Sequence, residues 1–232
     1  MKDWFYDETS QVGVDYGDKA EADVYDERME RFRNYAQEAR TFVEKLNFPD
    51  LSRITAIDIG CGTGAFAVHA AKYLKQVHAV DVSGEMLRIA RSKAEGMGVS
   101  NIHFHQAGYL DFTAPKPVEV INTKWALHHL PDYWKQAALL RMNQMLKPGG
   151  VLLITDWVFL FDPDFERAMD EVVTEMSRNF SQDFVREAKG HLREEFSTFD
   201  WVLRGMIERA GFEIEHADLE VPLAAEYVCR KV

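Results

Sequence analysis

The sequence has few cysteines and no long apolar run. Only Cys61 and Cys229 occur among 232 residues, which is too few for the disulfide framework of a small secreted protein. No apolar stretch approaches the roughly 20 residues that cross a bilayer, and residues 1–8 lack the apolar core of a signal peptide. We therefore expect a cytoplasmic protein that has no membrane partner.

Basic residues are scarce relative to acidic ones. The chain has 27 Lys and Arg against 38 Asp and Glu, which gives a formal net charge of −11. A field of that sign repels phosphate backbones, and no run of Lys or Arg suggests a basic patch. We expect no nucleic-acid partner.

Motifs of several other protein classes are missing. His103 and His105 alternate on a predicted strand, but no Cys or His spacing matches a zinc site, so no metal ligands are predicted. The G-x-S-x-G elbow of many serine hydrolases is absent. Because repeats, low-complexity tracts and linkers are absent as well, we expect residues 1–232 to form a single domain.

Strand and helix patterns alternate through most of the chain. Strands are predicted at 54–59, 76–82, 101–106, 118–124, 151–156, 212–219 and 225–231. Helices are predicted at 64–74, 84–96, 132–146 and about 199–210, and Ser83 is well suited to cap the second of them. This order is typical of an α/β protein with a doubly wound, mostly parallel sheet and helices on both faces.

Two segments fall outside this alternation. Residues 1–18 are aromatic, acidic and aperiodic, and we interpret them as an irregular arm. From Lys19 to Asn47 apolar residues recur every three or four positions, which predicts one amphipathic helix that packs on the sheet or forms a lid. A second stripe at about 160–197 predicts one bent helix, or two helices with a cap at Ser181.

The most informative stretch is Ile54–Gly64, a buried strand pattern that empties into a glycine turn before a helix. Such a turn offers backbone N–H groups and a helix N-terminus to an anionic or polar ligand group. Asp81 ends the next strand pattern, 21 residues after Gly60, about where an acid binds a ribose. The chain is therefore expected to bind a nucleoside-bearing cofactor, and the loose G-x-G-x-x-A match leaves NAD(P) open.

The segment Asp58-Ile59-Gly60-Cys61-Gly62-Thr63-Gly64 resembles the first motif of the class I S-adenosylmethionine (SAM) methyltransferases. The later segments 80–83, 122–130 and 146–154 resemble the ribose-binding, fourth-strand and fifth-strand motifs of that family, in the right order. The resemblance implies a Rossmann-like, seven-stranded sheet that ends in an antiparallel hairpin. It also implies that SAM is the cofactor and S-adenosylhomocysteine (SAH) the product, and that 1–50 and about 160–197 form a substrate lid.

The resemblance assigns a role to each part of the cofactor site. The glycine loop and Asp58 face the amino-acid tail, Asp81 binds both ribose hydroxyls, and Val82 and Met86 form a wall for adenine. Thr123, Lys124 and Trp125 line the methionine half of the cofactor, and Tyr25 lies near it. The predicted cofactor residues are Asp58, Gly60, Cys61, Gly62, Thr63, Gly64, Asp81, Val82, Met86, Ala107, Gly108, Tyr109, Thr123, Lys124, Trp125 and Tyr25.

The sequence departs from the family after the third predicted strand. The family often has an acid here for the adenine amino group, whereas this chain has Ala107-Gly108-Tyr109, with Asp111 further on. Backbone groups of Gly108 and Tyr109, or stacking by Tyr109, have to substitute.

The expected reaction is in-line transfer of a methyl group to a small-molecule acceptor by a monomer or a homodimer. His128, His129 and His191 are the candidates for a catalytic base, each with a structural role as the alternative. Three other functions stay open: a methyltransferase that acts on protein or RNA, a non-catalytic SAM-binding module and an NAD(P) oxidoreductase. The sequence does not identify the acceptor.

Overall fold

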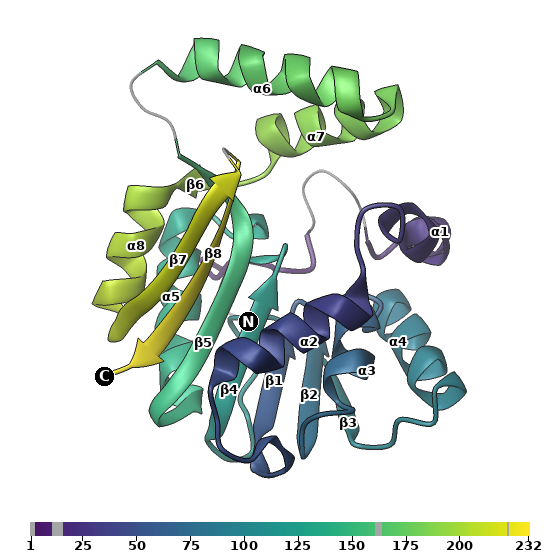
Figure 1. Cartoon of the computed structure of the whole chain (residues 1–232), viewed down its shortest axis with the longest axis vertical. Helices are drawn as coiled ribbons and strands as arrows, with labels where there is room; N and C mark the ends of the chain where they lie inside the picture. The colour runs from purple at the N-terminus through teal and green to yellow at the C-terminus, as the bar shows by residue number, and fades with distance from the viewer. Residues whose placement is uncertain (1–2, 11–15, 161–163, 222) are drawn as a thin grey trace.

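The central sheet follows the predicted doubly wound order. The computed structural model describes residues 3–10, 16–160, 164–221 and 223–232. Its strands run in the order β3-β2-β1-β4-β5-β8-β7, with the short β6 beside β5 (Figure 1). β1 to β5 are parallel, and β8 is antiparallel to both of its neighbours, β5 and β7. The strands are β1 (Thr55–Ile59), β2 (Gln76–Asp81), β3 (Ile102–Gln106), β4 (Val118–Lys124), β5 (Leu146–Phe159), β6 (Thr198–Phe199), β7 (Phe212–Val221) and β8 (Ala224–Lys231).

Each face of the sheet has its own apolar core, because successive strand side chains point to opposite faces. Ala56 of β1 belongs to a cluster with α2 (Tyr35–Leu46), α3 (Ala65–Ala70) and α4 (Gly84–Gly96). Its neighbour Ile57 belongs to the cluster with α5 (Asp132–Met145) and α8 (Asp200–Arg209). Helices therefore cover both faces, as the sequence predicts.

The prediction of one helix from Lys19 to Asn47 is wrong. The chain forms α1 (Lys19–Met29) and α2, and the segment between them is not helical. The Asn34 side chain caps α2 by accepting a hydrogen bond from the Gln37 N–H at 3.0 Å. An Asn at this position competes with the helical path of the backbone and starts a new helix instead.

Two serines cap helices as predicted. The Ser83 hydroxyl accepts a hydrogen bond from the Met86 N–H at 3.1 Å, and Ser181 accepts one from Phe184 at 3.3 Å. The segment at about 160–197, called the insertion below, therefore consists of two helices, α6 (Phe165–Asn179) and α7 (Gln182–Glu194). They lie together beyond the carboxyl end of β5 (Figure 1).

The apolar stripe of the insertion packs partly against the N-terminal segment. Phe184 and Phe180 lie 4.8 and 5.7 Å from the Phe32 ring, between α1 and α2. α6 has no buried side chain among its described residues, so its stripe is not part of the core.

Among the described residues, no helix is long and apolar enough to cross a membrane. Cys61 and Cys229 are both free and buried.

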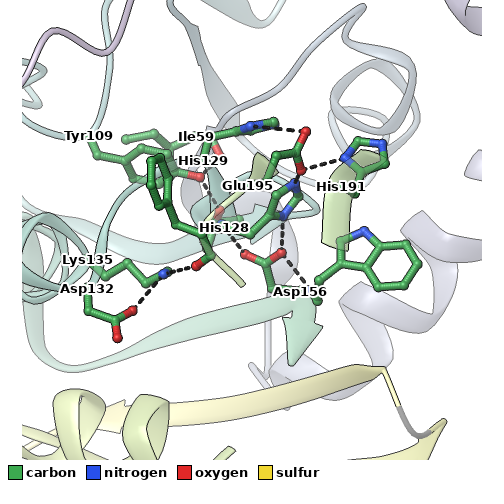
Figure 2. A network of polar contacts seen from close by, with 12 residues as sticks. Ile59, Tyr109, His128, His129, Asp132, Lys135, Asp156, His191 and Glu195 are labelled. Carbon is green, nitrogen blue, oxygen red and sulfur yellow. Dashed lines mark hydrogen bonds and ion pairs between the residues drawn. The ribbon is translucent and has the colours of Figure 1, made fainter. Parts of the chain in front are cut away.

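A buried polar network joins the insertion to the sheet (Figure 2). His128 follows β4, and its ring lies between two carboxylates: Nδ1 pairs with Asp156 of β5, and Nε2 lies 3.0 Å from Glu195 beyond α7. The backbone N–H of His128 also donates to Asp156 at 2.9 Å. His191 of α7 contacts the same Glu195 oxygen at 2.5 Å. Four side chains from three parts of the chain thus meet at one point.

The two carboxylates decide the charge of His128. Burial disfavours its cationic form, but Asp156 and Glu195 outweigh that effect and raise the pKa of His128 to about 9. Burial acts to raise the pKa of Glu195, but its bonds to His128 and His191 hold that pKa well below its usual range. The network is therefore an imidazolium between two carboxylates at neutral pH.

Three side chains of this network also have the spacing of metal ligands. Ligand-type atoms of His128, His191 and Glu195 lie within 4.8 Å of one another. The direct ion pairs of His128 with Asp156 and Glu195 already bring these groups together, and the absence of a metal site stays a prediction.

The core packing of α5 can be tested at two neighbouring leucines. Leu139 is fully buried, whereas Leu140 is 44% exposed. We expect Leu139→Ala to lower the free energy of unfolding by about 2–5 kcal/mol, because it leaves a cavity. Leu140→Ala should change it by about 0.5 kcal/mol or less. Urea unfolding of both variants measures the difference, and equal losses would contradict this packing.

The buried imidazolium predicts a pH dependence of stability. The pKa of His128 is raised from 6.5 to about 9 on folding, so its stabilisation is present below pH 6.5 and is lost as the pH rises through about 9. Between pH 6.5 and about 9.5 the wild type should therefore lose more unfolding free energy than His128→Gln does. His216→Gln, at an exposed position of β7, is the control and should follow the wild type. Parallel wild-type and His128→Gln profiles in urea unfolding would refute the assignment.

Candidate active site

A cavity lies at the carboxyl ends of β1, β2 and β4, where the strand order reverses. This is the edge at which open α/β sheets bind ligands. Its floor consists of the residues that follow these strands, and one wall comes from the N-terminal segment. The predicted cofactor residues that line it are Asp58, Gly60, Cys61, Gly62, Thr63, Asp81, Val82, Met86, Ala107, Gly108, Tyr109, Lys124, Trp125 and Tyr25.

The glycine loop has backbone conformations and contacts that exclude other residues. Gly60 has φ of +75°, and a Cβ there would lie 2.4 Å from the Cβ of Ala126. Gly62 has φ of +54°, and no heavy atom of the described residues lies within 4 Å of its Cβ position. Since Gly62 lines the cavity, its missing side chain leaves that space open to a ligand.

Asp81 connects the end of β2 to the glycine loop. One carboxylate oxygen accepts a hydrogen bond from the Gly62 N–H at 2.8 Å, and the other accepts from the Ser83 N–H at 2.9 Å. Burial raises the pKa of Asp81, while these two bonds favour its ionised form. Each oxygen keeps a further lone pair for a donor in the cavity.

Charged side chains of both signs meet below Asp58. Asp58 is buried, its pKa is raised to about 6 by burial, and it accepts a hydrogen bond from Asn122 at 2.8 Å. Arg33 donates from Nε and a terminal nitrogen to Glu38, at 3.0 and 2.7 Å. Lys124 lies 3.2 Å from the same carboxylate. Because one carboxylate serves two cations, Arg33 and Lys124 keep donors for a ligand anion.

Trp125 leaves β4 in a conformation that bulky residues rarely adopt. Its φ is +56°, which costs energy unless neighbouring contacts enforce it. Its N–H donates to the Thr155 carbonyl at 2.7 Å, and its ring lies 5.8 Å from that of Trp157. This backbone turn directs the chain after β4 along the cavity.

Tyr109 has a role that the sequence did not indicate. Its hydroxyl hydrogen-bonds to Thr123 at 2.6 Å and lies 3.4 Å from the Ile59 carbonyl. The side chain is buried, so it supports the end of β1 from below and its hydroxyl is already bound. Tyr109 also lines the cavity, whereas Thr123 does not, so stacking of the Tyr109 ring on adenine stays a prediction.

The three candidate bases have different positions. His129 lines the cavity, 5.9 Å from the ring of Tyr16. Burial and the neighbouring His128 charge lower the pKa of His129 to about 3. His128 and His191 belong to the buried network and do not line the cavity (Figure 2).

Gly64, a predicted cofactor residue, does not line the cavity either. A Cβ at this position would lie 2.7 Å from Ala90 of α4, so this glycine allows close helix packing.

Six described residues of the N-terminal segment line the cavity but are not among the predicted cofactor residues. They are Tyr6, Glu8, Ser10, Tyr16, Arg33 and Tyr35. The aromatic and acidic composition of the arm was the available signal, but no spacing links it to the motifs. Arg33 was hidden because the stripe from Lys19 to Asn47 predicted a continuous helix through it.

Known proteins share both the motifs and the fold. Residues 56–150 match the family model of a methyltransferase domain. An uncharacterized methyltransferase of Geobacillus kaustophilus is 26% identical over 199 residues, 84% of this chain and 87% of that protein. The uncharacterized methyltransferase YcgJ of Bacillus subtilis is 31% identical over 133 residues, 57% of this chain and 50% of that protein.

A solved structure shows the same fold. SAM-bound CalS10, an amino pentose methyltransferase from Micromonospora echinaspora, superposes with a TM-score of 0.68 and covers 90% of this chain and 97% of that chain at 16% identity. The predicted fold class is confirmed, and the match of residues 56–150 to a methyltransferase domain agrees with the predicted cofactor, SAM. Residues 56–150, which hold the glycine loop and Asp81, therefore match a methyltransferase domain, and the chain has the class I methyltransferase fold.

Proposed function

We propose that the protein transfers the methyl group of SAM to a small-molecule acceptor and releases SAH. The observation that carries this proposal is the composition of the cavity wall. Tyr6, Tyr16, Tyr25, Trp125 and His129 line the same cavity as the glycine loop. An acceptor that meets the methyl group within this aromatic enclosure is a small molecule rather than a large, folded surface.

The cofactor is oriented by groups at two ends of the cavity. At one end Asp81 accepts both ribose hydroxyls, and Val82 and Met86 pack against adenine. At the other end Asp58 holds the tail ammonium, and Arg33 with Lys124 holds the tail carboxylate. Charge-assisted hydrogen bonds of this kind are about twice as strong as neutral ones, so the two ends together fix the sulfonium between them.

The chemistry requires alignment more than activation. The sulfonium already activates the methyl group, so the reaction is one in-line displacement in which the acceptor bonds to carbon as the C–S bond breaks. Holding the reacting groups in line can contribute about 7–11 kcal/mol. Tyr25 and Trp125 offer ring faces that attract the cation, each worth about 0.5–2 kcal/mol.

His129 contributes as a neutral hydrogen-bonding group. With a pKa lowered to about 3, its imidazole is unprotonated at neutral pH and is a weak base. It can accept a hydrogen bond from the acceptor and orient it. His128 and His191 act behind it, through the buried network. This assignment favours acceptors whose attacking atom needs little help with deprotonation.

Two further observations support a small acceptor. The net charge of −11 opposes the approach of RNA. Proteins of the same fold include an amino pentose methyltransferase and mitomycin 7-O-methyltransferase, both of which are named for small-molecule acceptors. A panel of small amines, phenols, sugars and carboxylates, followed by SAH release, tests the proposal. Methyl label found only in the protein or RNA fraction of a cell extract would overturn it.

Asp81 provides a test of the ribose contact. We expect Asp81→Ala to weaken SAH binding at least about tenfold, because two charge-assisted hydrogen bonds are lost. Binding of 5′-methylthioadenosine, which has the same ribose but no amino-acid tail, should weaken by a similar factor. Calorimetric titration measures both ligands, with NADH as the control that should not bind. SAH affinity indifferent to Asp81 would contradict this orientation.

Arg33 provides a matched test of the tail. Arg33→Gln should weaken SAH binding about 10- to 100-fold, because an ion pair to the tail carboxylate is lost. It should leave binding of 5′-methylthioadenosine nearly unchanged. Lys124 still pairs with Glu38 in this variant, so no buried carboxylate is left uncompensated. Equal losses for both ligands would mean that Arg33 acts on the fold of the cavity rather than on the tail.

A further inference from the structure

The acid that the loop after β3 lacks is replaced in space by Glu8. Gly108 has no side chain, and a Cβ built on it would lie 2.4 Å from the carboxylate carbon of Glu8. Both carboxylate oxygens lie within 2.5 Å of the same point. An Asp side chain at position 108 would put its own carboxylate in this volume. Glu8, 100 residues earlier in the chain, therefore fills the place of the missing acid.

The Glu8 carboxylate is held in a defined orientation. One oxygen accepts a hydrogen bond from the Tyr109 N–H at 2.7 Å, and the other accepts one from the Leu110 N–H at 2.8 Å. Each oxygen therefore keeps one further lone pair for a donor. Arg141 donates its own N–H groups to the carbonyls of Tyr109 and Phe112, at 3.1 and 2.8 Å. The hydrogen bonds that hold the Glu8 carboxylate thus come from neutral backbone N–H groups.

The surroundings of Glu8 suit a ligand donor. Glu8 lines the cavity together with Val82 and Met86, the proposed adenine wall. Burial raises the pKa of Glu8 to about 7, and the hydrogen bonds from Leu110 and Tyr109 only partly oppose it. A carboxylate in this state is stabilised by any further N–H group that reaches it. The exocyclic amino group of adenine is such a donor, whereas a carbonyl at the same position is repelled.

Neighbouring aromatic residues hold the arm where Glu8 can reach the loop. Trp4 stacks on Trp134 of α5 at 6.2 Å, and Phe5 meets the same ring edge-on at 5.0 Å. The Tyr6 hydroxyl donates to the His129 carbonyl at 3.3 Å. Glu8 follows directly, so its position is set by packing on α5 and by the loop after β4.

We propose that Glu8 recognises the adenine of the cofactor by accepting a hydrogen bond from its 6-amino group, in the place where a side chain at position 108 would lie. The inference rests on the cofactor orientation proposed above. It makes the N-terminal arm part of the cofactor site, so the site is complete only when the arm is docked on α5.

The test compares SAH with S-inosylhomocysteine, in which a 6-oxo group replaces the 6-amino group. Above about pH 8, where Glu8 is ionised, the wild type should bind SAH at least about tenfold more tightly, because a carboxylate that accepts a hydrogen bond from the 6-amino group repels a 6-oxo group. Glu8→Ala should reduce this ratio to about twofold or less. The ratio of the two affinities matters more than either affinity alone, because loosening of the arm weakens the binding of both ligands to the same extent. Asp7→Asn, which removes a neighbouring exposed charge, is the control and should keep the wild-type ratio.

A second variant moves the carboxylate back to the loop. Removal of Glu8 vacates the space around Gly108, whose φ lies outside the left-handed region, so an Asp is tolerated there. The double variant Glu8→Ala with Gly108→Asp should restore the preference for SAH. The proposal fails if Glu8→Ala keeps the wild-type ratio, or if it binds SAH more tightly, which would identify Glu8 as a latch that blocks the site. If Asp81→Ala also leaves SAH binding unchanged, the cofactor orientation itself is wrong.

Discussion

The site depends on the close approach of two chain turns, at Gly60 and Ala126. A Cβ at Gly60 would lie 2.4 Å from the Cβ of Ala126, so only glycine lets the turn after β1 pass the turn after β4. The N–H groups of Gly60 and Cys61 donate to the Val80 carbonyl at 2.9 and 3.0 Å, which joins the same turn to β2. Three strand ends are thereby held at one edge of the sheet. The acids at the ends of β1 and β2, and the turn after β4, face one cavity because of this junction.

The N-terminal segment then completes the cavity from outside the sheet. Asp26 of α1 accepts a hydrogen bond from the Thr63 hydroxyl at 2.6 Å, and the Tyr16 carbonyl accepts one from Ser83 at 2.7 Å. Thr63 and Ser83 belong to the loops after β1 and β2, so the segment contacts the same loops that we propose to position the cofactor. A ligand that bridges the sheet edge and the arm binds the docked state more tightly and stabilises it. Cofactor binding and arm docking are therefore coupled through shared residues rather than through a distant signal.

The parts of the site that follow a strand could be predicted, because the signal is local. The glycine turn, Asp81 and Trp125 each come directly after a buried run, and the strand order brings such positions together. Glu8 and Arg33 could not be predicted, because their contacts span about a hundred residues or depend on a helix break that Asn34 imposes. Tyr109 illustrates the same limit: its place in the sequence indicates the adenine loop, but its ring fills the space beneath Gly60. Tertiary packing, which has no period in the sequence, decides these three cases.

The buried network gives the cavity a neutral histidine beside a cationic cofactor. Two carboxylates raise the pKa of His128 to about 9, and the resulting charge, together with burial, lowers the pKa of His129 to about 3. A protonated His129 would repel the sulfonium that we propose to bind in this cavity. The positive charge is instead held one residue away, where Asp156 and Glu195 compensate it. Glu195 comes from the segment after α7, so the docking of the insertion and the charge state of the cavity depend on the same ion pair.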